Sequence, residues 1–442
     1  MKRKSVSILT FGCRVNQYES DAMRTRLSAH FDMDSDSPDV ILLNACTVTA
    51  LAEKKARQAA RRARRRAPVA LIVLIGCLAD AVASGLTRFD EADLLVSGFW
   101  KPRIDEVVRA ALAGTRGCLP QPRESGTVGS LAGHAPERDT ERSDGPTHRI
   151  RAVLKIQDGC DLSCAYCRPT QVRGPSRSRS VDQVVAEAVR LDQLGFPEVV
   201  LTGINLALYA PGIQRLPDLL RGVLDATGIE RIRLASINAS GLTPQLLELF
   251  AGERRLCQHF HVPMQSGDDE VLTRMRRGYT AAAYEEALER VRLTLPKATF
   301  GADVIVGFPG ESPSAFEATV HLVERIGYVN LHIFRFSPRP GTEAATMAGR
   351  VPEHDKRRRA EALDRIWRSS LDRLLDKRIG TTQHVLAEEH RQGRWLGYTR
   401  DYIHVSFESD HQIALGDECL VRITRSLEGA LEGVEEHRDN ER

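Results

Sequence analysis

Short apolar runs alternate with longer amphipathic stretches over the first part of the chain. The apolar runs cover residues 5–11, 40–43 and 69–75, and helical periodicity covers residues 16–29 and 47–66 between them. Strand and helix signals that alternate in this way predict a parallel sheet with right-handed crossover connections. We therefore expect an α/β domain with a βαβαβ core over residues 1–118.

The same alternation returns near residue 148 and continues to residue 377. Helical periodicity, for example in residues 181–194 and 284–295, separates six apolar runs that predict strands. The six predicted strands are residues 152–156, 198–202, 231–236, 259–263, 300–306 and 330–335. A closed barrel of this kind has eight βα units, so six units predict a partial, open (β/α)6 barrel over residues 148–377.

The remaining segments have a different character. Residues 378–428 contain short alternating strands separated by polar turns, which predict a small β-barrel. Residues 119–147 are rich in Pro, Gly, Ser and charge, and we interpret them as a linker between the first two domains. Residues 429–442 are polar, and we expect them to form a disordered tail.

Composition restricts the class of protein. The chain has 442 residues, of which 42% are hydrophobic, and this is enough for two or three domains with substantial cores. No apolar run approaches the length of a membrane helix, and the basic N-terminus lacks the apolar stretch of a secretory signal. An odd number of cysteines, nine, spread over a long chain fits a reducing, cytoplasmic setting better than a disulfide framework. The net charge is only +3, so a nucleic-acid surface would have to be a local basic patch.

Three cysteines carry the most specific chemical signal. Cys160, Cys164 and Cys167 form a C-x-x-x-C-x-x-C pattern directly after the first predicted barrel strand. A 4Fe-4S cluster normally takes four cysteine ligands, so three leave one iron open to a small molecule. A zinc site or a disulfide knot is the alternative. Zinc usually takes four ligands in closely spaced pairs, and no second pair lies nearby, so the spacing favours an iron–sulfur cluster.

This motif resembles that of the radical S-adenosylmethionine (SAM) enzymes. In that superfamily the open iron binds the amino and carboxylate groups of SAM, and an electron from the cluster splits SAM into methionine and a 5′-deoxyadenosyl radical. The resemblance also supports the partial barrel, which is the usual core of these enzymes. It implies SAM contacts at the ends of predicted strands two, four and five, namely at Gly203, Asn205, Gln265, Ser266 and Gly307. For each glycine taken singly, simple turn geometry is the favoured explanation.

Two arginines near the cysteine motif are further candidates for contact with SAM. Arg173 and Arg177 follow the three cysteines in the string VRGPSRSRS. Either guanidinium could pair with the SAM carboxylate or with a phosphate. Solvated loop charges are the alternative explanation.

The first domain supplies a second set of three cysteines. Cys13, Cys46 and Cys77 each follow one of its predicted strands, at intervals of 33 and 31 residues. Parallel strands end at one edge of a sheet, where open α/β folds place their ligands, so the three thiols should meet there. A single cysteine at a strand end is more often a small buried hydrophobic residue. Three at equivalent positions favour a second cluster, again with one open iron.

A narrower resemblance covers nearly the whole chain. The strings TFGCRVNQYESD and NACTVTALAEKKARQ resemble the N-terminal domain of the methylthiotransferases, which are radical SAM enzymes with two clusters. This resemblance implies that Cys13, Cys46 and Cys77 hold an auxiliary 4Fe-4S cluster that supplies or carries sulfur. It also places Asn16 and Asn44 near that cluster, although a role in turns and capping is equally open.

Two regions are candidate RNA contacts. The string GYTRDYIHV resembles the TRAM module, an RNA-binding barrel found at this place in the methylthiotransferases. Its aromatic and basic residues could stack on or neutralise RNA, or the tyrosines could be barrel core; they are Arg394, Tyr398, Arg400 and Tyr402. The predicted helix 47–66 carries eight Lys and Arg residues facing a single acid, Glu53. These cations could neutralise tRNA phosphates or could form a solvated face.

Within the family, the strings CRVNQYESD, IQDGCDLSCAYC and FSPRPGTEAA look most like the tRNA threonylcarbamoyladenosine methylthiotransferases. This resemblance implies the conversion of N6-threonylcarbamoyladenosine in tRNA to its 2-methylthio derivative, with two 4Fe-4S clusters and two SAM molecules per turnover. One SAM would methylate a sulfur at the auxiliary cluster, and the other would give the radical that removes hydrogen from carbon 2 of the adenine. A reducing protein such as flavodoxin or ferredoxin is implied, and the sulfur donor is left open.

Three other functions stay open from the sequence. They are methylthiolation of isopentenyladenosine in tRNA, methylthiolation of an aspartate in a ribosomal protein, and a non-enzymatic iron–sulfur protein that binds RNA. Three residues depart from the family pattern: Arg168 replaces an apolar residue, Asn238 a Glu, and Ala207 a Gly. None is one of the six cysteines, so they bear on the contacts with SAM and substrate.

Overall fold

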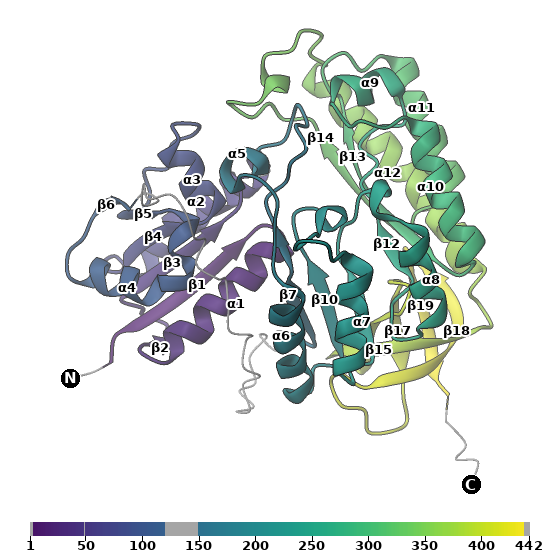
Figure 1. The fold of residues 1–442 in the computed structure, drawn as a ribbon, viewed down its shortest axis with the longest axis horizontal. Coiled ribbons are helices and arrows are strands. Elements are labelled where there is room, and N and C mark those ends of the chain that lie inside the picture. Colours follow the sequence, from purple (N-terminus) through teal and green to yellow (C-terminus); the bar gives the residue numbers. More distant parts are fainter. Residues whose placement is uncertain (1–2, 48, 120–148, 437–442) are drawn as a thin grey trace.

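The computed structural model describes residues 3–47, 49–119 and 149–436, and its three folded parts follow the chain in order (Figure 1). The predicted linker lies outside the described residues, apart from Leu119, which ends strand β6 (Gly117–Leu119). Among the described helices, none is both long enough and apolar enough to cross a membrane.

The first domain is a six-stranded parallel sheet in the order β2-β1-β3-β4-β5-β6. The other strands are β1 (Ser5–Phe11), β2 (Asp32–Met33), β3 (Val40–Ala45), β4 (Leu71–Ile75) and β5 (Leu94–Val96). Helices α1 (Arg14–Ser28) and α4 (Ile104–Leu112) pack on one face, and α2 (Ala50–Arg66) and α3 (Cys77–Ala83) on the other. The strands are apolar on both sides because helices cover both faces, and the predicted α/β domain is confirmed.

The central domain contains the six predicted parallel strands in two groups of three. The strands are β7 (Arg151–Lys155), β10 (Glu198–Thr202), β11 (Arg231–Leu234), β12 (His259–His261), β13 (Thr299–Val306) and β14 (Asn330–Arg335). Isolated bridges from Ile232 to Leu256 and from Ser236 to His261 connect β11 to the second group. The strands therefore form one curved, open row, and the predicted partial barrel is confirmed.

Helices cover the outer surface of this partial barrel, as Figure 1 shows. They are α6 (Val181–Gln193), α7 (Leu216–Ala226), α8 (Pro244–Gly252), α9 (Asp269–Arg274), α10 (Ala281–Thr294), α11 (Pro313–Ile326) and α12 (Glu353–Asp376). The short elements β8 (Gln157–Asp158), α5 (Pro169–Arg173) and β9 (Arg177–Ser178) flank the loop of the second cysteine set.

The C-terminal part is a closed five-stranded barrel in the order β15-β16-β17-β19-β18. Its strands are β15 (Thr382–Arg391), β16 (Arg394–Thr399), β17 (His404–Glu408), β18 (Glu418–Leu427) and β19 (Ala430–Glu435). The expectation of a disordered tail from residue 429 is wrong for residues 430–435, because β19 pairs with both β17 and β18. The segment looks polar in sequence because half-buried glutamates, Glu432 and Glu435, lie on the same short strand as the buried Leu431.

The C-terminal barrel covers the amino ends of the central strands. Arg231 and Arg233 are fully buried there, and both pair with the equally buried Glu198 at 2.8 Å. Their remaining N–H groups donate to backbone carbonyls of the turn after β16, including that of Thr399 at 3.0 Å from Arg231. Glu198 therefore fixes two guanidinium groups that hold the C-terminal barrel in place.

The aromatic residues of the TRAM-like segment belong to this same contact. The ring of Tyr402 stacks on His259 at 4.8 Å between centroids and on Tyr398 at 4.9 Å. Arg400 donates to the carbonyls of Glu230 and Arg254, in the central domain. The tyrosines and Arg400, expected as RNA contacts or barrel core, are thus used mainly to join two domains.

Arg394, the fourth residue of that set, has a different place. It is bonded to Ser406 and Glu408 within the C-terminal barrel. Its guanidinium is therefore committed to barrel contacts.

The buried Glu198 gives the first prediction. Burial alone would raise the pKa of Glu198, but Arg233 and Arg231 outweigh burial and hold that pKa far below its ordinary value. Replacing Glu198 by Gln leaves two buried guanidinium groups without a carboxylate, and should lower the free energy of unfolding at pH 7 by about 3–5 kcal/mol. Urea denaturation of the metal-free protein measures this difference.

The pH dependence has a defined sign. Because the pKa of Glu198 is depressed in the folded state, its contribution is complete above about pH 4.3 and is lost as the pH falls further. The difference between wild type and Glu198→Gln should therefore shrink in acid. Glu324→Gln, an exposed change on α11, serves as the control and should alter stability by less than about 0.5 kcal/mol. An equal loss in both variants would contradict the buried-charge account.

Candidate metal centres

The first cysteine set meets at the carboxyl edge of the N-terminal sheet, as expected. Cys13 follows β1, Cys46 follows β3, and Cys77 begins α3 after β4. The backbone N–H of Cys46 donates to the carbonyl of Phe11 at 3.0 Å. Gly12 makes the close approach possible, because a Cβ atom there would lie 2.4 Å from that of Cys46.

Two asparagines hold this edge together. The thiol of Cys13 lies 3.4 Å from Asn16 Oδ1, and Asn16 Nδ2 lies 3.4 Å from Asn44 Oδ1. Asn44 also donates to the Asn16 carbonyl and to Ser20 Oγ, both at 2.9 Å. Both asparagine side chains are fully buried. They connect the loop of Cys13 to the strand that leads to Cys46, which agrees with their expected place near a cluster.

The second cysteine set lies on the loop between β8 and α5. The N–H of Cys160 donates to the carbonyl of Gly174 at 3.1 Å, and the N–H of Cys167 to the carbonyl of Cys164 at 3.0 Å. Ala165, inside the motif, donates its N–H to the carbonyl of Met275 at 3.0 Å. These bonds fold the loop over the carboxyl end of the barrel, the end where catalytic groups of such barrels lie.

Arg173 connects the two cysteine sets. It ends helix α5, six residues after Cys167, and its Nε donates to the sulfur of Cys77 at 3.1 Å. Its Nη1 lies 3.0 Å from Glu19 and 2.8 Å from Asp158. Arg173, which follows the second cysteine set, thus touches a cysteine of the first set. The sequence had suggested instead that Arg173 contacts SAM.

A buried group of five charges surrounds this contact. Its members are Glu19, Lys101, Lys155, Asp158 and Arg173, and we call it the buried charge cluster. Lys155 lies 3.2 Å from Glu19 and 2.8 Å from Asp158, and Lys101 pairs with Glu19. Burial would raise the pKa of Glu19, but the three cations hold it well below its ordinary value. The lysine that interrupts the apolar run 152–156 was the sequence signal for this cluster, and it was missed.

Arg277 lies against the second cysteine set. Its Nη1 is 3.4 Å from the sulfur of Cys164 and 3.4 Å from the hydroxyl of Tyr166, and its Nε donates to Tyr279 at 3.0 Å. Its Nη2 lies 3.3 Å from Asn238, one of the residues that depart from the family pattern. Asn238 therefore gives Arg277 a neutral partner.

Neither cysteine set is arranged to hold a single zinc ion. The described cysteines form no disulfide. Among the described residues, only one group of three or more His, Cys, Asp or Glu side chains has its ligand atoms within 4.8 Å of one another. This group is His261, Asp303 and His332, and neither cysteine set meets the condition. The sulfurs of each cysteine set are therefore more widely spread than bonds of about 2.3 Å to one zinc would allow. Burial raises the pKa of Cys167 to about 11 and also raises that of Cys77, so metal binding would have to displace their protons.

The first two expected SAM residues lie beside the second cysteine loop. The N–H groups of Ile204 and Asn205 donate to Gln157 Oε1 at 2.9 and 3.0 Å, directly after Gly203. Gln157 also donates to the carbonyl of Gly159 at 2.7 Å. The side chain of Asn205 caps its own turn by accepting from Ala207 N at 3.2 Å. Gln157, which sequence reasoning missed, thus ties the end of β10 to the cysteine loop.

The other three expected SAM residues have internal partners. Gln265 has a φ of 69° and exchanges backbone bonds with β13. Ser266 Oγ lies 3.4 Å from Thr319 Oγ1 of α11. A Cβ at Gly307 would lie 2.3 Å from the side chain of Lys356, so helix α12 explains this glycine. Contact with SAM stays a prediction for all five residues.

Arg168, another departure from the family pattern, has a structural role. Its guanidinium is buried and donates to the carbonyl of Pro340 at 2.6 Å and to that of Leu86 at 3.2 Å. It therefore joins the cysteine loop to the first domain. Ala207 packs against Gly241, where a Cβ atom would lie 2.7 Å away.

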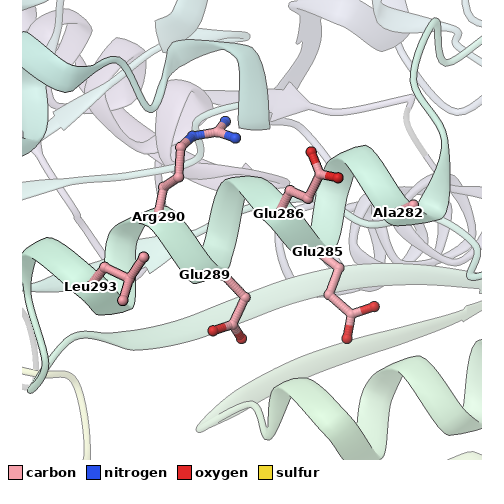
Figure 2. A pocket seen from close by; sticks show the side chains of 6 residues that line it. All are labelled: Ala282, Glu285, Glu286, Glu289, Arg290 and Leu293. Atoms are coloured by element: carbon pink, nitrogen blue, oxygen red, sulfur yellow. The ribbon is translucent and has the colours of Figure 1, made fainter.

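The basic helix α2 is partly neutralised. Arg57 and Arg61 pair with Glu91, and Arg64 pairs with Asp93. Glu53, the acid in the helix itself, is buried and pairs with Arg339. Three further cations of α2 line a groove of about 520 Å³ against β1, namely Lys55, Arg62 and Arg66. A different hollow, on the outer face of α10, is lined by none of the cysteines (Figure 2).

Comparison with known proteins agrees with this arrangement. A model of the radical SAM superfamily matches residues 154–323, and a model described as Uncharacterized protein family UPF0004 matches residues 5–97. Threonylcarbamoyladenosine tRNA methylthiotransferase MtaB of Chlamydia pneumoniae is 33% identical over 96% of this chain and 97% of its own length. The tRNA-2-methylthio-N(6)-dimethylallyladenosine synthase of Aquifex aeolicus is 31% identical over 97% of this chain and 98% of its own.

A solved structure supports the fold. The radical SAM methyltransferase TsrM of Kitasatospora setae superposes with a TM-score of 0.56 at 17% identity, over 78% of this chain and 77% of that one. At 17% identity, this likeness concerns the fold alone. The radical SAM match implies a 4Fe-4S cluster and SAM.

The second prediction concerns iron content. Protein reconstituted without oxygen should bind about eight irons, and Cys46→Ala or Cys160→Ala should each bind about four. Iron analysis with Mössbauer spectra measures both numbers. Cys118→Ala, a change at an exposed cysteine outside both sets, is the matched control and should keep about eight. About four irons in the unchanged protein would contradict the two-cluster assignment.

Proposed function

The chain belongs to the radical SAM methylthiotransferase family, and from that premise we propose that it inserts a methylthio group at carbon 2 of N6-threonylcarbamoyladenosine in tRNA. The relatives named for this activity match nearly the full chain at 32–33% identity. We further propose an auxiliary 4Fe-4S cluster on Cys13, Cys46 and Cys77, two SAM molecules per turnover, and a flavodoxin or ferredoxin as reductant in the cytoplasm.

One observation carries the proposal, namely the contact of Arg173 with Cys77 of the first cysteine set. Sulfur insertion needs a sulfur site and a radical site within reach of one substrate atom. Arg173 ends helix α5, which directly follows the loop of the second set. Cys160 follows two residues after Asp158, which pairs with the same arginine. Arg173 and Asp158 therefore lie between the two proposed sites.

The chain's own residues would bind and orient the reacting groups. When bound, the clusters and SAM supply methyl transfer to sulfur and a radical that can attack the C2–H bond, which is inert to acid–base chemistry at neutral pH. Cys160, Cys164 and Cys167 would hold the radical cluster, with Arg277 beside Cys164. The carboxyl end of the barrel is left for the substrate, because the C-terminal barrel covers the other end.

The lining of the barrel favours a polar substituent on the adenine. His261, Asp303 and His332 lie on neighbouring strands, opposite the apolar positions that pack on the helices. Asp303 Oδ1 accepts from His261 at 3.1 Å and from His332 at 3.0 Å. A threonylcarbamoyl group offers hydroxyl, carbonyl and carboxylate partners to such a lining, whereas a dimethylallyl group offers it no hydrogen-bond partner.

The cations of α2 fit the expected tRNA partner. The side chains that line the groove beside β1, Lys55, Arg62 and Arg66, have the charge needed to neutralise phosphates. The helix starts just after Cys46, so Lys55 lies near the edge where the first cysteine set lies, whereas Arg62 and Arg66 lie at the other end of the helix. A tRNA backbone held along this groove would extend from the proposed sulfur site toward the opposite edge of the sheet.

The third prediction separates the roles of the two cysteine sets. Cys160→Ala should abolish cleavage of SAM, and Cys46→Ala should retain uncoupled cleavage while losing methylthiolation by more than a hundredfold. Anaerobic assays for 5′-deoxyadenosine and mass spectrometry of tRNA nucleosides measure both. Methylthiolation retained in Cys46→Ala would refute the role of the first set. The 2-methylthio form of dimethylallyladenosine in place of the threonylcarbamoyl product would favour the sister activity.

The fourth prediction tests the polar lining. His332→Phe should reduce the rate with threonylcarbamoyladenosine tRNA about tenfold, because one hydrogen bond to the substrate or to Asp303 is lost. Dimethylallyladenosine tRNA should be used no worse than by the wild type. His354→Phe, on a side chain of α12 that is 81% exposed, is the matched control. An equal loss with both substrates would mean that His332 has no part in selecting the substituent.

A further inference from the structure

We propose that Arg173 is a positioning residue that fixes the auxiliary cluster through the sulfur of Cys77 and raises the reduction potential of that cluster. The inference rests on the proposed ligand set Cys13, Cys46 and Cys77. Arg173 follows the loop of the second cysteine set, so a residue of the central domain would tune the reduction potential of a cluster in the N-terminal domain.

The contact geometry supports a direct effect on the sulfur. Arg173 Nε lies 3.1 Å from Cys77 Sγ, within hydrogen-bond range for sulfur. The guanidinium is 7% exposed, and Cys77 is buried as well. A hydrogen bond to a ligand sulfur and a positive charge beside it both favour the more negative, reduced form of a cluster. In a buried site such an effect is little screened by solvent.

The charges that surround this contact act on Cys77 as well. The buried charge cluster contains three cations and two carboxylates. A second cation also lies close to this edge, because a Cβ at Gly76, next to Cys77, would be 3.3 Å from Lys101 Nζ. Asp80 is a third carboxylate near this site, because both Lys101 and Arg173 act on it. Burial raises the pKa of Cys77, while Arg173 and Lys101 act in the opposite direction, with Arg173 the stronger of the two. The effect on the cluster therefore depends on the direct contact of Arg173 with the Cys77 sulfur.

The attachment of Arg173 explains why its position is fixed. Nη1 bridges Glu19 of α1 and Asp158 of the central domain, so both domains hold the same guanidinium. Nη2 also lies 3.5 Å from Asn16, which touches Cys13. The arginine therefore cannot move away from Cys77 without breaking bonds to both domains. A side chain of the central domain therefore sets the surroundings of the proposed auxiliary cluster in the other domain.

The experiment measures the midpoint potential of the auxiliary cluster in the full-length chain. Replacing Cys160, Cys164 and Cys167 by Ala leaves the first cysteine set alone, and an anaerobic redox titration followed by EPR gives its potential. In this parent, Arg173→Met should shift the potential to a more negative value, because charge and hydrogen bond are both removed. Arg173→Lys, which keeps the charge, should shift it less.

A change of opposite sign makes the test specific. Glu19→Gln removes a negative charge beside the same guanidinium, so it should shift the potential to a more positive value. A merely structural role would move both variants in one direction or neither. Arg179→Met is the matched control, since Arg179 is also buried but pairs with Glu187, and its shift should be far smaller than that of Arg173→Met.

The outcomes separate this inference from the proposed function. Unchanged potentials in Arg173→Met and Glu19→Gln, with about four irons retained, would overturn the inference and leave the two-cluster enzyme intact. Loss of iron in Arg173→Met would support the positioning role, and Arg173→Lys and Glu19→Gln would then decide the effect on the potential. A parent that holds no iron would overturn the auxiliary cluster itself, and the inference with it.

Discussion

Five buried charges between the first two domains determine where the chemistry of this protein can occur. Glu19 comes from the N-terminal domain and Asp158 from the central one, and Arg173 pairs with both. Ion pairs in such a setting give little net stability, because each ion loses its hydration. Their effect is geometric, since a misplaced domain would leave several charges buried without partners. The interface therefore has one favourable arrangement, and that arrangement brings the two cysteine edges together.

A second group of buried charges acts at the opposite end of the barrel. Glu198, Arg231 and Arg233 receive the C-terminal barrel there, and the ring of Tyr402 stacks on His259 beside them. The C-terminal barrel, which resembles an RNA-binding module, thus uses Tyr398 and Tyr402 to cover the amino end of the central barrel. Tyr398, Tyr402 and Arg400 are therefore occupied by contacts between the two domains. A substrate could therefore enter the central barrel from its carboxyl end, which faces the N-terminal domain.

The sequence was sufficient for the features that depend on local pattern. Strands β1, β3 and β4 and the six strands of the central domain follow from their apolar runs, whereas the short strands β2, β5 and β6 were not predicted. The meeting of Cys13, Cys46 and Cys77 follows from the geometry of parallel strands. Features that depend on distant partners were not predictable in the same way. The role of Arg173 depends on a cysteine 96 residues away, and that of Gly307 on helix α12. Strand β19 was missed because its burial arises from pairing with β17 and β18.

Each cysteine set has an arginine guanidinium beside one of its sulfurs. Arg277 is largely buried beside Cys164, yet the described chain places no carboxylate within ion-pair distance of it; its partners are Tyr166, Tyr279 and Asn238. A buried guanidinium with neutral partners is costly unless an anion completes its surroundings. A cluster bound by thiolates, with the carboxylate of SAM at its open iron, would provide that anion. The fold thus places a guanidinium beside each cysteine set, and the proposed clusters would place an anion next to each of them.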